Sequence, residues 1–534
     1  MASQRDSEYK PLLFTTTVRN PQRLKGLLWV LKKYDGQVLT DNLATAIVGE
    51  TIRYGLYRPM KKSPSIKNKW ANTPMGEFAN RLLTNEEVRY MLDNNPQKHK
   101  EAGFAWGFPS RFATIFDFAK ELGFVYFQPN KKIEFSELGN KIASVFCVQE
   151  LGDEKSGAVI IVEEEHPEYE QQAFLQSMCK YQRSNPFVRV LNDNVPLLLL
   201  LEVLKKINAN PDWNGKGITR KELPLLIFWK DNDAEALYQR IIQLREQYRY
   251  NPSDEVVVDI CVNEIMEGKM KKFDSRSIIN DYPDEFIRKM RLTGLISLRG
   301  AGRFIDINHN EDERVEYVLS KYSKYEKYCT EREYFDYMAT IDENLFSIES
   351  IKVSATQTEE LLIGWTKEYS WDSIKFELET LSNRRDSKDD ILRFLPSPVR
   401  LEFLTALAIK SKMPNVRVLP NYSCDDTGLP TSTAGGGIGD IECIEQPNGI
   451  LVEVTMAEGR QQTMMEIWPI ERHLVAFKEK YTPNSQCIFV APSIFSDSIS
   501  QIDWVKGMNG HTIRPYKISD FICYLETETK LYAI

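Results

Sequence analysis

The pattern of hydrophobic and polar positions first becomes regular just after residue 110. Phe112 opens a run of apolar residues at helical spacing that Gly123 ends, and two short apolar runs and a second helical run follow. The pattern predicts, in order, a helix over 112–122, strands over 124–127 and 133–135, and a helix over 136–143. This order is typical of a winged-helix module, whose recognition helix can enter the major groove of DNA. Arg111 would lie near the start of that helix, and Lys131 and Lys132 at the hairpin tip.

A similar pattern returns later in the chain. Helical spacing over 286–292 is followed by apolar runs over 295–298 and 304–307, which predict a second helix and hairpin. Glycines at the tip permit a tight turn that brings Arg299 and Arg303 together. Winged helices also serve as protein–protein scaffolds, so one unit does not decide between DNA and protein as the partner. Two such units favour double-stranded DNA.

At 534 residues the chain is too long for a single hydrophobic core. Helical periodicity dominates between the two winged-helix patterns. Residues 316–385 are rich in Tyr, Glu, Lys and Ser and have only patchy apolar periodicity, so we expect a helical linker that makes few specific contacts. We predict a multidomain protein with a mainly α N-terminal recognition region, a helical linker and a C-terminal α/β domain. The predicted parts are a first recognition subdomain over 1–170, a second over 171–315, the linker over 316–385 and the C-terminal domain over 386–534.

Two apolar runs on either side of Gln446 to Gly449 predict a β-hairpin in the C-terminal domain. Asp440 and Glu453 lie at its two ends, and the register decides whether their carboxylates can cooperate. If only the last two of the four central residues form the turn, Asp440 lies opposite Ala457, and Glu453 is roughly 13 Å away along the strand. A four-residue turn places Glu453 opposite Glu442, a diagonal neighbour of Asp440 at about 7–8 Å. An even-length turn keeps both carboxylates on one face, and a shared metal requires the four-residue turn or its equivalent.

Further acidic residues lie in the neighbouring segments. Glu402 falls in a stretch over 399–407 that predicts an amphipathic helix beside the sheet. Glu466 and His473 are seven residues apart and share a face if their segment is helical, although a helix histidine can equally make a structural hydrogen bond. A strand over 487–492 would complete the sheet. Helix, hairpin, helix and strand are the core order of PD-(D/E)xK nucleases, in which carboxylates hold ions that clamp the scissile phosphate and activate water.

Charge is distributed unevenly along the chain. The net charge is −8, yet residues 1–110 carry 17 Lys and Arg against 10 Asp and Glu. A basic N-terminal part indicates a localised surface for a polyanion. The segment 53–70 interleaves basic and aromatic residues, which suits loop contacts to phosphates. The residues that we expect to contact DNA there are Arg53, Arg58, Lys61 and Lys62.

Cysteine and histidine usage favours oxygen ligands for any metal. The eight cysteines include no Cys-x-x-Cys pair and there are only five histidines, so we expect no zinc module, disulfide framework or histidine-rich centre. Carboxylates favour Mg²⁺ or a similar hard cation. No apolar run approaches the roughly 20 residues that span a bilayer, and the N-terminus has no signal-peptide core, so we expect a cytoplasmic protein.

Several C-terminal segments resemble the AlwI/PleI-like type IIS restriction endonucleases and their nicking relatives, a PD-(D/E)xK family. The resembling segments are 401–405, 439–442, 451–455, 472–473 and 489–492, with a looser likeness at 15–21. The resemblance implies an endonuclease domain over 386–534. It implies that Glu402, Asp440 and Glu453 are metal ligands, with Glu466 and His473 as supporting active-site residues. Thr455 stands where most such nucleases have lysine, a departure that the resembled family shares, and a second metal or His473 would have to compensate.

The resemblance also implies an activity. We expect a bacterial or archaeal enzyme that binds a short asymmetric site on double-stranded DNA and uses Mg²⁺, or Mn²⁺ in its place, to hydrolyse phosphodiester bonds at a fixed distance outside it. Because one site cuts one strand, double-strand cleavage needs a second nuclease domain, from a transient homodimer or a separate small nuclease subunit. A cognate methyltransferase is the expected partner in a restriction–modification system. Two alternatives are a strand-specific nicking endonuclease and a winged-helix DNA-binding regulator with an inactive nuclease-like domain.

Overall fold

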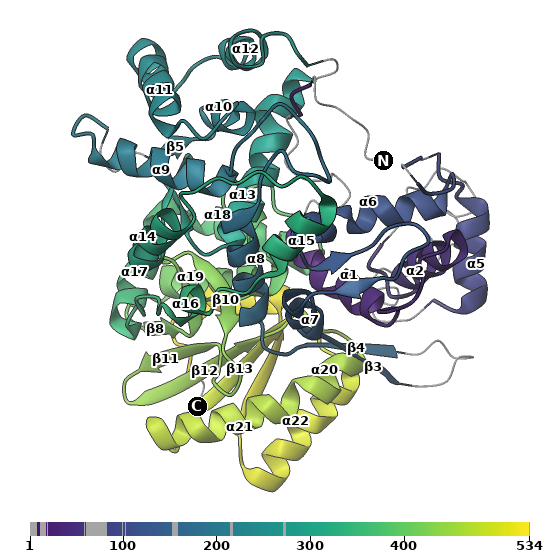
Figure 1. Ribbon diagram of the computed structural model, residues 1–534. Coiled ribbons are helices and arrows are strands. Elements are labelled where there is room, and N and C mark those ends of the chain that lie inside the picture. Colours follow the sequence, from purple (N-terminus) through teal and green to yellow (C-terminus); the bar gives the residue numbers. More distant parts are fainter. Residues whose placement is uncertain are drawn as a thin grey trace. The chain divides into compact units, whose positions relative to one another are not determined.

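Figure 1 shows the computed structural model of the chain. The chain folds into two compact units. The N-terminal unit holds residues 1–296, 304–307 and 311–350, and the C-terminal unit holds 297–303, 308–310 and 351–534. The structure describes residues 8–10, 18, 20–57, 59, 83–98, 100–101, 103–151, 159–213, 217–270 and 274–532. The predicted DNA contacts Arg58, Lys61 and Lys62 lie outside the described residues. The division into four parts remains a prediction.

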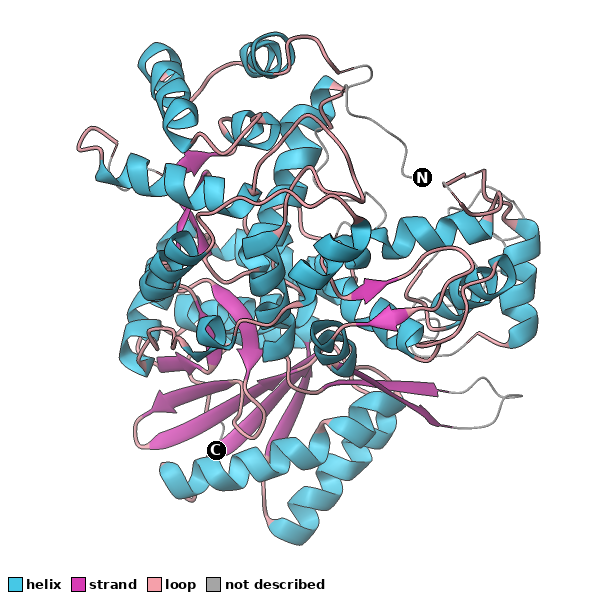
Figure 2. Ribbon diagram, viewed as in Figure 1, coloured by secondary structure: helices cyan, strands magenta, loops and turns pink. Residues whose placement is uncertain are grey.

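Helices make up most of the N-terminal unit (Figure 2). Its elements are η2 (Pro21–Arg23), α1 (Leu24–Lys32), α2 (Asp41–Arg53), α5 (Asn85–Asn94), α6 (Phe108–Glu121), β1 (Val125–Tyr126), β2 (Glu134–Phe135), α7 (Glu137–Ser144), β3 (Phe146–Leu151), β4 (Val159–Glu164), α8 (Glu168–Lys180), α9 (Pro196–Ala209), β5 (Ile218–Thr219), α10 (Leu223–Phe228), α11 (Ala234–Tyr248), α12 (Asp254–Asp259), η3 (Ile260–Ile265), η4 (Ser277–Asp281), α13 (Tyr282–Leu292), β7 (Phe304–Ile307), α14 (Asp312–Lys321), α15 (Glu331–Ala339) and α16 (Glu343–Ser347). Across all the described residues, no helix has both the length and the hydrophobicity needed to cross a membrane.

The first helix–hairpin–helix pattern forms in the predicted order, as α6, β1, β2 and α7. The two strands are antiparallel, with Val125 opposite Phe135. Gly123 follows α6 with a φ of +78°, which ends the helix as the sequence predicts. Helix α7 begins after Ser136, whose hydroxyl oxygen accepts a hydrogen bond from the N–H of Gly139. The elements are confirmed, and their identity as a winged-helix module remains a prediction.

The second pattern also forms, as α13, β6 (Ile296–Arg299) and β7. The tip between the strands has three consecutive residues with positive φ, from Gly300 to Gly302. Only the middle one, Ala301, has a side chain, so the two glycines allow the tight turn that the sequence predicts.

The predicted linker over 316–385 is helical, but residue 350 divides it between the two units. Its second half packs closely within the C-terminal unit. The indole of Trp365 meets the ring of Phe403 edge to face at 5.8 Å, and Glu359 accepts a 2.9 Å hydrogen bond from the ammonium of Lys410. The expectation that this segment makes few specific contacts is therefore wrong for its second half. Its apolar and acidic side chains pack against and hydrogen-bond to other residues of the C-terminal unit.

The C-terminal unit contains a five-stranded mixed sheet in the order β14-β13-β12-β11-β8. The elements that complete this unit are α17 (Ala355–Glu368), α18 (Trp371–Ser382), η6 (Leu392–Phe394), α19 (Ser397–Lys412), β8 (Arg417–Pro420), β9 (Tyr422–Cys424), β10 (Pro430–Ala434), β11 (Ile441–Glu445), β12 (Asn448–Val454), α20 (Arg460–Met465), α21 (Ile467–Lys480), β13 (Gln486–Ala491), α22 (Ser496–Asn509), β14 (Ile513–Lys517) and α23 (Ile518–Thr527). Strands β8, β11 and β12 are antiparallel neighbours, whereas β12, β13 and β14 run parallel.

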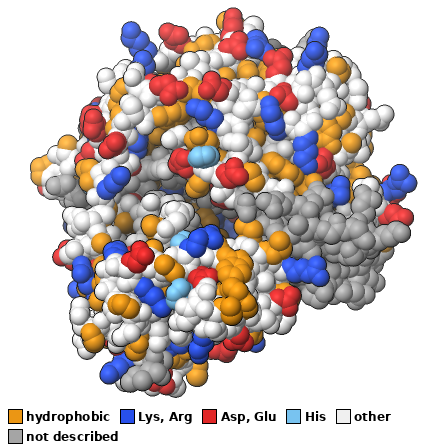
Figure 3. Space-filling view, turned by 90° about the horizontal axis from the view of Figure 1, so that it is seen from below, with side chains coloured by type: hydrophobic (Ala, Val, Ile, Leu, Met, Phe, Trp, Pro, Cys, Tyr) orange, Lys and Arg blue, Asp and Glu red, His pale blue; other side chains and the backbone are white. Residues whose placement is uncertain are grey.

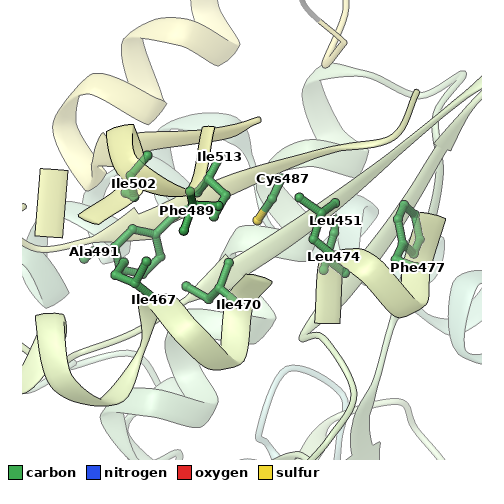
Figure 4. Packing of buried hydrophobic residues seen from close by; sticks show 11 residues of the cluster. Leu451, Ile467, Ile470, Leu474, Phe477, Cys487, Phe489, Ala491, Ile502 and Ile513 are labelled. Carbon is green, nitrogen blue, oxygen red and sulfur yellow. The ribbon is translucent and has the colours of Figure 1, made fainter. Parts of the chain in front are cut away.

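Helices cover both faces of this sheet. Helices α21 and α22 lie on one face, and α19 lies on the other (Figure 1). Figure 4 shows the core on the α21 face, where Leu451 of β12 and Phe489 of β13 pack against Leu474 and Phe477 of α21. Because side chains alternate along a strand, Glu453 points to the same face as Leu451. The packing of α21 thus brings helix side chains to the end of β12 that carries Glu453.

Candidate active site

The hairpin of β11 and β12 sets Asp440 and Glu453 side by side. Ile441 pairs with Val452, and Glu445 with Asn448, so the turn consists of Gln446 and Pro447 alone. Extending the register by one residue places Asp440 directly opposite Glu453. Neither the two-residue turn at Asn448 and Gly449 nor the four-residue turn forms. The observed turn also has an even number of residues, so both carboxylates lie on one face of the sheet.

Packing against α21 explains the unexpected register. Asn-Gly favours a two-residue turn when both residues adopt positive φ, but Gly449 is not among the glycines with positive φ. A Cβ added to Gly449 would lie 2.8 Å from a ring carbon of Phe477. The absence of a side chain at Gly449 therefore lets α21 pack closely against β12. The chain turns at Gln446 and Pro447, two residues before the turn that Asn448 and Gly449 would have formed.

Backbone contacts hold Asp440 at the start of β11. Its Oδ2 accepts a 2.8 Å hydrogen bond from the N–H of Val454, across the hairpin. The N–H of Asn421 donates to the Asp440 carbonyl at 2.9 Å, and the Asn421 side-chain amide donates to the Gly439 carbonyl at 2.7 Å. Sequence reasoning missed Asn421, which lies between β8 and β9. The feature of the sequence that could have pointed to Asn421 is its position after the short apolar strand that precedes the hairpin.

Glu453 is anchored by a histidine of α21. The side-chain Nδ1 atom of His473 lies 3.0 Å from Oε1 of Glu453, which is only 5% exposed. Burial and the nearby Arg472 guanidinium lower the pKa of His473 below its usual value, which favours the neutral ring. In its Nδ1–H tautomer the ring donates to Glu453 and fixes the orientation of that carboxylate.

Glu466 is held by Thr455, the residue that follows strand β12. The Thr455 hydroxyl donates to Oε1 of Glu466 at 2.8 Å and accepts from the N–H of Ala457 at 3.0 Å. The helix predicted through Glu466 is interrupted, because α20 ends one residue before it and α21 begins one residue after it. Glu466 and His473 still lie close enough for each to shift the pKa of the other.

Glu402 reaches the site from α19. We expected an amphipathic helix, but every position from Val399 to Lys410 is buried. The helix lies between the sheet and its neighbours α17, α18 and α23, so an exposed polar face is absent from it. Oε2 of Glu402 accepts a 3.0 Å hydrogen bond from the N–H of Ala434, and the side chain is 4% exposed.

Four carboxyl groups thus share a region with little solvent: Glu402, Asp440, Glu453 and Glu466. Burial, followed by repulsion from Asp440, raises the pKa of Glu402 to about 9. Burial and repulsion from Glu453 raise the pKa of Asp440 well above its usual range, and burial with Glu466 and Glu402 does the same for Glu453. Within the described part of the chain, no lysine or arginine forms an ion pair with any of the four. The four groups therefore repel one another when they ionise, and a bound cation would relieve that repulsion.

The donor atoms of this cluster suit a hard divalent cation, because they are carboxylate oxygens. Among the residues that the structure describes, no three Asp, Glu, His or Cys side chains come together closely enough to form a complete metal cage. Asp440 and Glu453 face each other, whereas Glu402 approaches from a separate helix. The chemistry of the donors fits a metal, and the assignment of all three as its ligands remains a prediction.

The described residues that we predicted to contact DNA belong to both units. In the N-terminal unit, Arg53 lies over the Tyr54 ring at 5.9 Å and Arg111 donates twice to the side-chain oxygen of Gln97. Lys131 and Lys132 are exposed in the turn between β1 and β2. In the C-terminal unit, Arg303 is exposed, while Arg299 forms a 2.6 Å ion pair with Asp426 that a phosphate would have to replace.

Comparison with known proteins places this geometry in context. The family model described as AlwI restriction endonuclease matches residues 120–393 and 363–523. No curated protein matches the chain. The small subunit of the heterodimeric restriction endonuclease R.BspD6I is 21% identical, with 30% of this chain and 82% of that chain covered and a TM-score of 0.25. Restriction endonuclease FokI is 10% identical over 97% of both chains with a TM-score of 0.24, and FokI bound to DNA is 12% identical over 95% of both with 0.25.

Proposed function

The chain belongs to the AlwI restriction endonuclease family and is therefore a nuclease that acts on DNA, and we propose that it cuts as a type IIS enzyme, at a fixed distance outside a short asymmetric site. The observation that carries the proposal is that Asp440 lies opposite Glu453 and that both belong to a buried carboxylate cluster. The cluster belongs to the C-terminal unit and the basic residues 53, 111, 131 and 132 belong to the N-terminal unit, and this division of the chain supports cleavage outside the recognised sequence.

We propose that the C-terminal unit is a PD-(D/E)xK nuclease domain and that the two helix–hairpin–helix segments are winged-helix modules that read the DNA. The mixed sheet, with its acidic hairpin between α19 and α21, supports the first assignment. The exposed Lys131 and Lys132 at one hairpin tip, and Arg303 at the other, support the second. Contacts to phosphates from these tips would set position on the duplex.

Asp440, Glu453 and Glu402 would hold Mg²⁺, which supplies Lewis-acid stabilisation of the scissile phosphate and lowers the pKa of an attacking water. The protein's own contribution is orientation. The N–H of Val454 fixes Asp440, and His473 fixes Glu453. Thr455 uses its hydroxyl to hold Glu466 and brings no positive charge to the site.

Plasmid cleavage in Mg²⁺ tests this function. The wild-type protein should cut, and Asp440→Asn should not, since the substitution removes one charge of the facing pair without changing its size. Glu442→Gln is the matched control, because Glu442 lies two residues further on the same strand and pairs with Lys480 outside the cluster. Cutting by Asp440→Asn would refute the site, and DNA binding without any cutting by wild type would favour an inactive DNA-binding regulator.

Cutting both strands requires a second nuclease domain, and we propose that a second copy of the chain supplies it through the exposed apolar face of α21 and α22. The indoles of Trp468 and Trp504 are 40% and 48% exposed and meet edge to face at 5.4 Å. Figure 3 shows a patch of apolar side chains on the side of the molecule where these helices lie. Arg472 on α21 and Asp503 on α22, of opposite charge, are also exposed.

A twofold arrangement would let Arg472 meet Asp503 of the partner subunit, which makes the face self-complementary. Arg472→Asp and Asp503→Arg should each convert double-strand cleavage into nicking, and the double substitution should restore it. Nicking by the wild type would instead identify a strand-specific nicking enzyme. Double-strand cleavage by both single variants would indicate another contact surface or a separate small nuclease subunit.

A further inference from the structure

A short exposed loop rims the carboxylate cluster. We call residues 435–438 the glycine loop; it connects β10 to the start of β11, and all four of its residues are exposed. Hydrogen bonds hold both of its ends. The N–H of Ala434, just before the loop, donates to Glu402, and the carbonyl of Gly439, just after it, accepts from Asn421. The loop is thus held against the site while its middle faces solvent.

Two glycines of this loop are not required by the fold. Gly437 has a φ of +88°, and Gly439, next to the loop, leaves no room for a side chain because a Cβ would lie 2.7 Å from Oε1 of Glu453. Gly435 and Gly436 differ from both. Their φ angles lie outside the left-handed region, and a Cβ added to either would meet nothing within 4 Å. Glycine loses more conformational entropy on folding than alanine does. The close approach of a ligand to the loop backbone would favour glycine at these two positions.

The polar and apolar groups of the loop match a sugar–phosphate backbone. The N–H groups of Gly435, Gly436 and Gly437 donate no hydrogen bond to any described residue. Ile438, beside them, is 50% exposed although it is a large aliphatic side chain. Main-chain N–H groups are common phosphate donors, and they add no bulk between the loop and its ligand.

We propose that Gly435 and Gly436 are positioning residues for cleavage: their missing side chains let the DNA strand approach the loop backbone, with Ile438 against a deoxyribose, so that the scissile phosphate reaches Asp440 and Glu453. This inference rests on the proposed nuclease function. It assigns to uncharged N–H donors a task that a lysine or arginine performs elsewhere. The described carboxylate cluster has no such cation paired with it.

A graded series at residue 436 tests the proposal. Gly436→Ala and Gly436→Leu find open space in the free protein, so both should keep the wild-type melting temperature. KM for a cleavable oligonucleotide should rise with side-chain size, by about tenfold or more for leucine, because misplacement of the strand weakens productive binding. Gly435→Ala should act in the same direction. Gly364→Ala is the matched control, since Gly364 also has open space around it but lies in α17.

Hydroxyl-radical footprinting in Ca²⁺ gives a second readout that a structural defect would not reproduce. Gly436→Leu and Ile438→Ala should lose protection at the cleavage position and keep protection at the recognised sequence. Wild-type KM and protection in Gly436→Leu would overturn the inference while leaving the proposed function intact, provided that Asp440→Asn is inactive. A wild-type protein that cuts no DNA would overturn both.

Discussion

The Nδ1 atom of His473 lies 3.0 Å from Oε1 of Glu453, so a helix side chain orients a carboxylate at the end of the neighbouring strand. His473 stands at the middle of α21, and the apolar residues around it anchor that helix on the sheet. The same packing that builds the core therefore sets the geometry of the cluster.

Removing this contact should weaken metal binding more than folding. His473→Ala should raise the Mg²⁺ concentration for half-maximal cleavage by about 10- to 100-fold, the usual effect of losing a partner that orients a ligand. His473→Asn, which keeps a side-chain N–H, should recover part of the loss. The measurement is the initial cleavage rate against Mg²⁺ concentration. An unchanged Mg²⁺ dependence in His473→Ala would show that the histidine is only structural.

The Thr455 hydroxyl should matter through Glu466. Thr455→Val keeps the shape of the side chain and removes the hydrogen bond to Glu466, so we expect about a tenfold loss of kcat, on the scale of one hydrogen bond to a charged group. Thr455→Ser retains the hydroxyl and should stay close to wild type. Single-turnover cleavage at saturating Mg²⁺ measures the effect. Equal rates for the valine and serine variants would rule out this role.

Stability of the metal-free protein should fall as pH rises. The folded pKa of Glu402 is about 9, above the ordinary value of 4.5, so between these values the folded state holds a proton that the unfolded state has released. The stabilisation is full below pH 4.5 and is lost as pH approaches 9. Asp440 and Glu453 shift in the same direction.

Thermal unfolding in EDTA across this pH range checks that expectation. The melting temperature should decline toward pH 9, and added Mg²⁺ should reverse the decline because binding only to the folded state stabilises it. Asp440→Asn should flatten the pH dependence, whereas Glu442→Gln should not. A melting temperature that rises toward pH 9 in EDTA would contradict the clustering of these carboxyl groups.

Gly449 should tolerate no side chain. A Cβ would lie 2.8 Å from the Phe477 ring and 2.9 Å from the Ser485 hydroxyl oxygen, so Gly449→Ala should destabilise the C-terminal unit by about 1–3 kcal/mol through overpacking. Gly364→Ala, with open space, serves as the control. Urea unfolding measures both. Combining Gly449→Ala with Phe477→Leu should return part of the lost stability, and strictly additive effects would show that the ring is not the cause.

Local patterns predicted much of the fold. The order α6, β1, β2, α7 follows from spacing, from the glycine that ends α6 and from Ser136 at the start of α7. The hairpin of β11 and β12 follows from two apolar runs around a break. Burial of α19 on nearly all sides could not be predicted in the same way, because it depends on elements distant in sequence that cover its polar positions.

The sequence by itself determined which residues could form the site, since Glu402, Asp440, Glu453, Glu466 and His473 all lie in or next to the predicted strands and helices. Only the tertiary structure decided how they meet. The turn at Gln446 and Pro447, which sets Asp440 opposite Glu453, depends on the space that Gly449 leaves for Phe477. Periodicity reports which face a residue occupies, whereas register depends on packing between segments far apart in the chain.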